Sequence, residues 1–223
     1  MDERIKLFQE LAKLFENNGH SLYLVGGSVR DYLLNIPLTD MDLVTDATPR
    51  EEKSFLKDAD YTFEKFGSIK LKYKDVKFDI TTLRKETKYL DSRHPSEIIF
   101  TNKLEEDVFR RDLTINALYL SKDLKVIDLV NGQIDLSKHL IKMIGDPVIR
   151  IKEDPLRIIR VYRFKLELGF IVEPSLEKAI KENVDLINKI RIEKIKEEIH
   201  KSSHKEELIK LLKELGINNL NKY

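Results

Sequence analysis

The sequence of 223 residues contains no cysteine. This absence excludes a disulfide framework and a metal site built on thiolates. All apolar runs are shorter than the roughly 18 residues that a membrane-spanning helix needs. The charged N-terminal sequence MDERIK also lacks the apolar core of a signal peptide. We therefore expect a cytoplasmic protein without a membrane partner.

Neither sign of charge is in excess, because 40 Lys and Arg residues stand against 39 Asp and Glu residues, leaving a formal net charge of +1. Charged residues nevertheless make up 35% of the chain. Binding to a nucleic acid would therefore require that positive charge be segregated on one face. The length is sufficient for a sizeable core, in one large domain or two smaller ones.

The most distinctive local feature is the pair Asp40 and Asp42. If the apolar residues 41–44 form a strand, side-chain alternation puts both carboxylates on one face. Two such carboxylates repel each other unless a cation lies between them. Mg²⁺ suits this place because it binds carboxylate oxygens and also takes substrate phosphates as ligands. The alternative is a solvated acidic pair at the edge of a strand.

Two glycines, Gly26 and Gly27, end the preceding apolar run, and a helical pattern follows over residues 28–34. Glycine lets backbone N–H groups approach a phosphate closely, and a helix N-terminus favours an anion. Arg30 is expected in the first turn, where its guanidinium could hold a phosphate. A tight turn without a ligand is the alternative for the glycines alone.

Together, the sequence GGSVRD and the following DMD resemble the signature of the class II tRNA nucleotidyltransferase and bacterial poly(A) polymerase family. This family belongs to the polymerase-β-like superfamily. The resemblance implies that Asp40 and Asp42 bind catalytic Mg²⁺, for which Mn²⁺ could substitute. It also implies that Gly26, Gly27 and Arg30 hold a nucleoside triphosphate.

Asp79 interrupts an apolar strand pattern over residues 76–83, between Phe78 and Ile80. A charged residue in such a pattern lies either on the solvent face or in the acid cluster. Members of the polymerase-β-like superfamily often place a third carboxylate on a neighbouring strand. By that resemblance, Asp79 is the candidate for a third catalytic carboxylate.

A second motif, RRDLTINA, begins at residue 110. A guanidinium can bind phosphate in a bidentate manner, and a carboxylate can accept hydrogen bonds from ribose hydroxyls. A surface patch of ion pairs is the alternative for these residues alone. The motif is similar to RRDFTINA of the same family, with leucine in place of phenylalanine. The resemblance implies that Arg111 and Asp112 contact the triphosphate and ribose, with Asn116 nearby.

A third informative segment, EDPLRIIR, begins at Glu153. Asp154, Arg157 and Arg160 recur at i, i+3 and i+6, so we expect them to share one helix face. A carboxylate and a guanidinium can together cover the Watson–Crick edge of a base. A simple Asp–Arg ion pair is the alternative. The segment resembles the family motif in which these residues select the incoming base, and we include Glu153 and Arg160 in that group.

The expected fold is α+β, with a small mixed sheet and flanking helices followed by a helical neck. We place a nucleotidyltransferase head at residues 1–145 and the neck at 146–223. Full-length family members continue into a helical body and tail, which we expect to be absent here. The expected helices span residues 1–17, 28–34, 48–57, 174–183, 191–200 and 204–215, with another from residue 155, and the expected strands span 22–25, 41–44, 61–64, 68–73, 76–83 and 124–129.

The resemblance implies a template-independent enzyme that adds C and A from CTP and ATP to the 3′ end of tRNA, either as a monomer or as a homodimer. Residues 84–107 form a long connection without a sustained period, and KETKYLDSRHP within it resembles a flexible family loop. In the family this loop helps to switch from C to A addition. An A-only enzyme, a poly(A) polymerase and an inactive nucleotide- or RNA-binding module are the alternatives.

Overall fold

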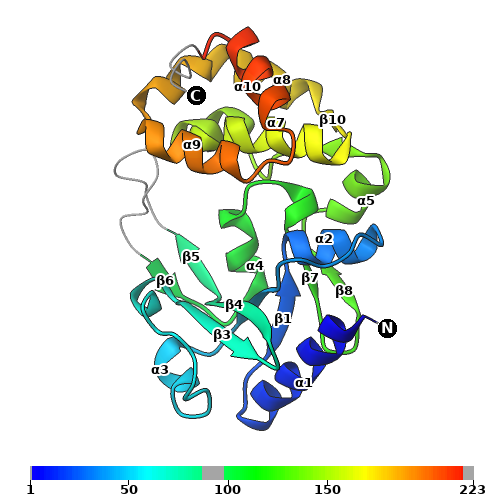
Figure 1. Ribbon diagram of the computed structural model, residues 1–223, viewed down its shortest axis with the longest axis vertical. Coiled ribbons are helices and arrows are strands. Elements are labelled where there is room, and N and C mark those ends of the chain that lie inside the picture. Colours follow the sequence, from blue (N-terminus) through cyan, green and yellow to red (C-terminus); the bar gives the residue numbers. More distant parts are fainter. Residues whose placement is uncertain (1, 87–97, 218–223) are drawn as a thin grey trace. The chain divides into compact units, whose positions relative to one another are not determined.

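The computed structural model describes residues 2–86 and 98–217. Within these residues the chain forms two compact units, shown in Figure 1 and considered separately below. The first comprises residues 2–86, 98–111 and 115–133, and the second comprises residues 112–114 and 134–217. The boundary between head and neck expected near residue 145 stays a prediction.

A six-stranded mixed sheet forms the centre of the first unit (Figure 1). Its strand order is β3-β4-β2-β1-β7-β8. The pair β2–β4 is parallel, whereas the other four pairs in this sheet are antiparallel. The strands are β1 (Leu22–Val25), β2 (Asp42–Thr45), β3 (Ser68–Tyr73), β4 (Val76–Thr82), β7 (Leu118–Leu120) and β8 (Val126–Asp128).

One face of this sheet is apolar because side chains alternate along its strands. In β4, Phe78 and Ile80 are buried, whereas Asp79 between them is exposed. Helix α1 (Glu3–Asn17) packs against β1 and begins where the Asp2 side chain accepts a hydrogen bond from the Arg4 N–H. Its helical apolar stripe is buried and consists of Ile5, Leu7, Phe8, Leu11, Ala12 and Phe15.

The remaining elements of the first unit are short. Helix α2 (Gly27–Leu33) contacts β1 and β7, and the separate pair β5 (Arg84–Glu86) and β6 (Ile98–Phe100) is antiparallel. The others are α3 (Pro49–Glu52), α4 (Leu104–Asp107) and the 3₁₀ segments Glu64–Phe66, Val108–Arg110 and Thr114–Asn116. In the segment Thr114–Asn116, Thr114 belongs to the second unit and the two following residues belong to the first. Helix α5 (Gly132–Ser137) likewise has residues in both units.

Helices dominate the second unit, and α7 (Leu156–Leu168) contacts α6, α9 and α10. Strands β9 (Leu140–Ile141) and β10 (Ile171–Val172) pair in parallel. In the helix expected over residues 204–215, Leu208 and Leu212 pack inward and are fully buried. The other elements are α6 (Pro147–Glu153), α8 (Pro174–Asn183), the 3₁₀ segment Val184–Lys189, α9 (Ile192–His200) and α10 (Lys205–Glu214).

Two predicted elements are wrong. The strand expected over residues 61–64 is absent, because the Asp60 carboxylate accepts hydrogen bonds from the amide and hydroxyl of Thr62 and turns the chain. A 3₁₀ turn, Glu64–Phe66, follows. The helix expected to reach residue 57 ends at Glu52, after a capping box between Thr48 and Glu51.

Other differences concern segments that carry little periodic signal. Strand β7 was not predicted, and the connection over residues 84–107 contains β5, β6 and α4. The predicted flexible loop KETKYLDSRHP lies almost entirely outside the described residues. Across the described ranges 2–86 and 98–217, no helix has the length and apolar character needed to cross a membrane.

Glu52, at the end of α3, is a buried carboxylic acid. Its side chain is fully buried, and neither carboxyl oxygen has a hydrogen-bond partner among the described residues. Burial, followed by repulsion from Glu51, raises the pKa of Glu52 to about 8. The folded state therefore favours the protonated acid. Its contribution to stability is fully present below the unfolded pKa near 4.5 and is lost as the pH rises through about 8.

We expect Glu52→Gln to become progressively more stable than the parent protein between pH 4.5 and pH 9, because glutamine has no charge to bury. Over this pH range, the free energy of unfolding of the variant relative to that of the parent protein should increase by on the order of 2–4 kcal/mol. Urea unfolding at several pH values measures it. The exposed Glu105 supplies a control, since Glu105→Gln should give a difference that does not vary with pH in this way. A pH-independent difference for Glu52→Gln would contradict the assignment.

Candidate active site

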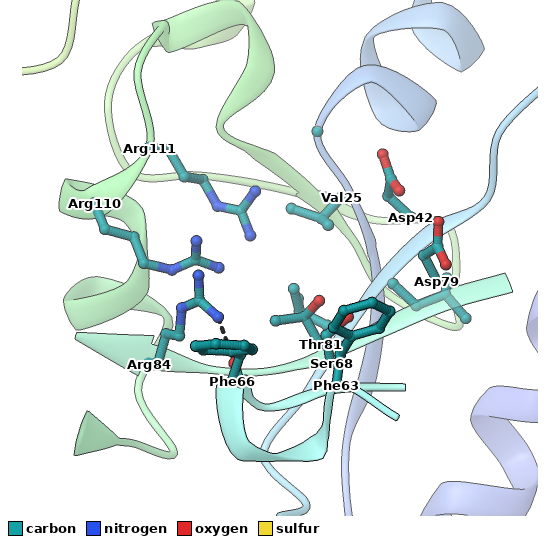
Figure 2. A pocket seen from close by; sticks show the side chains of 13 residues that line it. Val25, Asp42, Phe63, Phe66, Ser68, Asp79, Thr81, Arg84, Arg110 and Arg111 are labelled. Carbon is teal, nitrogen blue, oxygen red and sulfur yellow. Dashed lines mark hydrogen bonds between the residues drawn. The ribbon is translucent and has the colours of Figure 1, made fainter. Parts of the chain in front are cut away.

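The first unit contains a pocket of about 440 Å³ that opens beside the central sheet. Figure 2 shows that it has two chemically distinct ends, with carboxylates at one and guanidinium groups at the other. This separation of charge suits a ligand that carries both cations and phosphates. The lining residues are Val25, Gly26, Asp42, Leu43, Val44, Phe63, Phe66, Ser68, Asp79, Thr81, Arg84, Arg110 and Arg111.

The acidic end is formed by Asp42 on β2 and Asp79 on β4. These residues are direct partners in the parallel β2–β4 ladder, so their side chains leave the same face of the sheet. Burial, then repulsion from Asp79 and Asp40, raises the pKa of Asp42 to about 6. Arg111 opposes this shift. The buried position and the neighbouring carboxylates therefore disfavour the negative charge on Asp42, and a cation at this end would favour it.

Asp40 is exposed and lies just before β2, outside the residues that line the pocket. Ser28 fixes the backbone between the two aspartates. Its hydroxyl donates to the Asp40 carbonyl over 3.0 Å and accepts from the Asp42 N–H over 3.1 Å. The connection ties the acid motif to α2. The Asp79 carboxylate also forms a 3.5 Å ion pair with the exposed Lys70.

Asp107 organises the basic end of the pocket. Its carboxylate is fully buried and accepts from Arg110 Nε at 2.7 Å and from the Tyr119 hydroxyl at 2.9 Å. Arg111 Nη2 lies 2.8 Å from the same carboxylate. Burial alone would raise the pKa of Asp107, but attraction to Arg111 and Arg110 outweighs it and holds the pKa at about 2. Asp107 therefore remains ionised and orients both guanidinium groups.

The two glycines bring backbone and guanidinium groups close together. Gly26 has φ +70°, a conformation that side chains disfavour, and a Cβ there would lie 4.0 Å from Arg111 Nη1. A Cβ on Gly27 would lie 3.5 Å from Arg30 Nη2. Arg30 is buried, and its Nη1 donates to the Asn116 side-chain oxygen over 2.7 Å. It also pairs with Asp31.

Asp112 and Arg160 form an ion pair within the second unit. Arg160 Nε donates to one oxygen of Asp112, while the Leu113 N–H donates to the other over 2.8 Å. Burial alone would raise the pKa of Asp112, but attraction to Arg160 outweighs it and holds the pKa at about 2. The structure therefore joins the end of the RRD motif to α7.

The base-selecting segment departs from the predicted helix geometry. Asp154 ends α6 in an extended conformation, and α7 begins only at Leu156, so Asp154 does not share a helix face with Arg157 and Arg160. Asp154 instead accepts from the Leu156 N–H over 3.1 Å. Arg157 is buried and contacts Glu153 at 3.1 Å. Pro155 follows Asp154 directly, and the residue before a proline is disfavoured in the helical conformation, so a continuous helix through Asp154 is unfavourable.

The predicted site residues therefore fall into two groups. The first unit brings together Asp42, Asp79 and Arg111 around one pocket, with Gly26, Gly27, Arg30, Asp40 and Asn116 adjoining them. The second unit holds the pair Asp112–Arg160 and the segment that includes Glu153, Asp154 and Arg157. The catalytic and binding roles of these residues stay predictions.

Several site residues were not predicted from the sequence. Asp107 precedes Arg110 and Arg111 by three and four positions, and this spacing signals neighbours on one helical turn. It was therefore detectable. Ser28 carried no such signal, since a serine at the start of a helix is common. The pocket residues Phe63, Phe66 and Arg84 come together through tertiary contacts, such as the hydrogen bond that Arg84 donates to the Phe66 carbonyl.

Mg²⁺ fits the donor chemistry of the acidic end. Carboxylate oxygens are hard ligands, and Asp42 and Asp79 are direct partners in the β2–β4 ladder, so their carboxylates leave neighbouring positions on one face of the sheet. Among the described residues, however, no three His, Cys, Asp or Glu side chains converge as a preformed metal centre. Mg²⁺ usually retains water and takes substrate phosphates as ligands, so a complete protein cage is not required.

Residues 22–142 match the family model described as the poly A polymerase head domain. The chain belongs to the poly A polymerase head-domain family. This membership confirms the family and the α+β nucleotidyltransferase fold expected from the sequence motifs. The matched range contains the central sheet and both the acidic and the basic end of the pocket.

Proteins named CCA-adding enzyme are similar to this chain. The one from Lactobacillus gasseri is 43% identical over 189 residues, covering 85% of this chain and 48% of the relative. The one from Staphylococcus haemolyticus is 40% identical over 186 residues, covering 83% and 46%. A Bacillus stearothermophilus CCA-adding enzyme in complex with CTP has a TM-score of 0.88 and 29% identity, covering 98% of this chain and 54% of that one. The chain thus spans about half the length of these proteins.

Proposed function

We propose that this head-domain family member adds C and A, from CTP and ATP, to the 3′ end of tRNA. The observation that carries the proposal is the pocket in which clustered carboxylates face a group of guanidiniums, with the pKa of Asp42 raised to about 6. The similarity to CCA-adding enzymes favours this activity over transfer to a small molecule.

In the proposed reaction, the terminal 3′ oxygen of the RNA attacks the α-phosphorus of the bound triphosphate. A new oxygen–phosphorus bond forms, the bond to the bridging oxygen breaks, pyrophosphate leaves, and the proton of the hydroxyl passes to water. Arg111 is close enough to Gly26 to hold the triphosphate against the backbone there, and Arg30 supports this arrangement through Asn116. Oriented guanidiniums stabilise charge that develops on the phosphate oxygens.

Asp40, Asp42 and Asp79 are the residues that would hold Mg²⁺, or Mn²⁺ in its place. When bound, a divalent cation lowers the pKa of the attacking hydroxyl and neutralises charge on the phosphates. The protein's part is to hold the carboxylates in register. The β2–β4 ladder and the Ser28 hydroxyl supply that register.

Base selection is assigned to the second unit. On their Watson–Crick edges, CTP and ATP both present an exocyclic amine beside a ring acceptor, whereas UTP and GTP do not. Asp154 could accept from the amine, and Arg157 could donate to the ring acceptor. Glu153 holds the Arg157 guanidinium, and Arg160 fixes Asp112, which we assign to the ribose hydroxyls.

An extension assay tests the proposal. We expect tRNA that ends at its discriminator base to be extended with CTP alone, and to reach the full CCA end when CTP and ATP are both supplied. UTP and GTP should not be incorporated. Denaturing gels resolve products that differ by one nucleotide.

The alternatives give different patterns in the same assay. Incorporation of ATP without CTP would indicate an A-only enzyme or a poly(A) polymerase. Absence of incorporation with all four nucleotides, from a protein that still binds CTP, would indicate an inactive binding module. Either pattern would overturn the proposal of CCA addition.

A further inference from the structure

Two phenylalanine rings line the pocket although they are largely exposed. Phe63 is 49% exposed and Phe66 is 43% exposed, and both adjoin a cavity whose other side chains include Asp42 and Asp79. A scattered exposed apolar residue needs no explanation. Two exposed rings in one charged pocket do need an explanation, because they offer flat apolar surfaces where phosphates and cations are expected. Figure 2 shows Phe63 toward the acidic end and Phe66 toward Arg84.

The segment that carries these rings is held in place by its backbone. The Phe66 N–H donates to the Phe63 carbonyl over 2.9 Å, and Arg84 donates to the Phe66 carbonyl. Gly67 follows with φ +77°, where a Cβ would lie only 2.6 Å from the Phe100 ring. Only glycine fits there, so the turn after Phe66 is fixed. The rings are therefore presented by a defined 3₁₀ turn.

A cation accompanies the rings. Lys65 is exposed, and its Nζ lies 4.8 Å from the centroid of the Phe66 ring. Exposed aromatic rings interleaved with a lysine are the combination that binds single-stranded nucleic acid, because bases stack on the rings and the cation contacts the phosphodiester backbone. The segment YTFEKF thus has the chemistry of a small RNA platform.

We infer that Phe63 and Lys65 bind the single-stranded 3′ end of the acceptor RNA, with the Phe63 ring stacked on a base and Lys65 near a phosphate. The inference rests on the proposed function. The arginine end of the pocket suits the triphosphate, and the attacking oxygen must approach the α-phosphorus roughly opposite the leaving pyrophosphate. The acceptor therefore enters from the acidic end, where Phe63 lies.

Binding of a short fluorescein-labelled single-stranded RNA, followed by fluorescence anisotropy without nucleotide, tests this inference because it needs no turnover. We expect Phe63→Ala to raise the Kd for RNA on the order of tenfold or more. Phe63→Tyr should restore the parent affinity, since tyrosine keeps a flat ring. Phe109→Ala is the matched control, because Phe109 is 63% exposed but does not line the pocket.

Steady-state extension then separates the two substrates. Phe63→Ala should raise the KM for RNA by a similar factor while leaving the KM for CTP unchanged. An unchanged Kd for RNA, a tyrosine variant as weak as the alanine variant, or an equal loss in Phe109→Ala would overturn the inference. The parent protein could bind RNA through Phe63 and yet incorporate none of the four nucleotides. That result would refute the proposed function and still support the inferred RNA-binding role of Phe63.

Discussion

Asp42→Asn should lower the rate of nucleotide incorporation on the order of 10²- to 10³-fold, the loss typical when one electrostatic group is removed from an active site. Asp42 lines the acidic end of the pocket, and burial followed by repulsion from Asp79 and Asp40 raises its pKa to about 6. Asparagine has nearly the same size as aspartate, but it carries no negative charge to balance that of a divalent cation. Single-turnover extension of labelled RNA measures the effect.

Unfolding should not explain this loss. Burial and the neighbouring carboxylates raise the pKa of Asp42 from 3.8 to about 6, so its contribution to stability is present at low pH and lost as the pH rises through 6. Asp42→Asn should therefore be at least as stable as the parent protein at pH 7. Magnesium should raise the thermal midpoint of the parent protein but not that of the variant.

Asp75→Asn is the matched control for Asp42→Asn. Asp75 lies in the turn between β3 and β4, its side chain is 91% exposed, and its backbone has φ +67°, which asparagine tolerates. Its activity and its response to magnesium should match those of the parent protein. Equal activity of Asp42→Asn and the parent protein would refute the role of Asp42.

Asp107→Ala should lower the free energy of unfolding by about 3–5 kcal/mol, the cost of removing one member of a buried ion pair. The Asp107 carboxylate is fully buried and pairs with both Arg110 and Arg111, so its loss removes the buried counter-ion that the two guanidiniums share. The Tyr119 hydroxyl also loses its acceptor. Urea unfolding at pH 7 measures the change.

The effect of Asp107→Ala should depend on pH in a defined direction. The folded-state pKa is held at about 2, below the unfolded value of 3.8, so the carboxylate stabilises the fold above pH 4 and loses this effect as the pH falls toward 2. The difference between parent and variant should shrink over that range. Glu105→Ala, an exposed change in the same helix α4, should show neither effect. A loss below about 1 kcal/mol for Asp107→Ala, the value of a surface ion pair, would contradict a buried role.

Elements with a clear apolar period could be predicted from the sequence. The stripe of α1, the alternation of β3 and β4 and the Pro-initiated α8 all lie close to their expected positions. The acid motif on β2 and the RRD motif were also recognisable. Asp79 was a candidate because a carboxylate interrupted an apolar alternation, and its pairing with Asp42 in the ladder explains that interruption.

The parts that could not be predicted depend on contacts between distant segments. Strand β7 is short and buried on all its residues, so it shows no alternation that marks a strand. The false strand over residues 61–64 had suitable residues, but the Asp60 side chain satisfied the local backbone instead. Ser28 gained its role only because the chain returns from α2 to bring Asp40 and Asp42 beside it.

The register of the parallel strands β2 and β4 decides whether Asp42 and Asp79 lie on the same face of the sheet. Phe78 and Ile80 alternate with Asp79, so a slip by one residue would turn Asp79 into the apolar layer and push both hydrophobic side chains into water. Such a mispaired strand would lose several kcal/mol of apolar burial. Burial of Phe78 and Ile80 on the opposite face of the sheet thereby fixes the register that pairs Asp79 with Asp42.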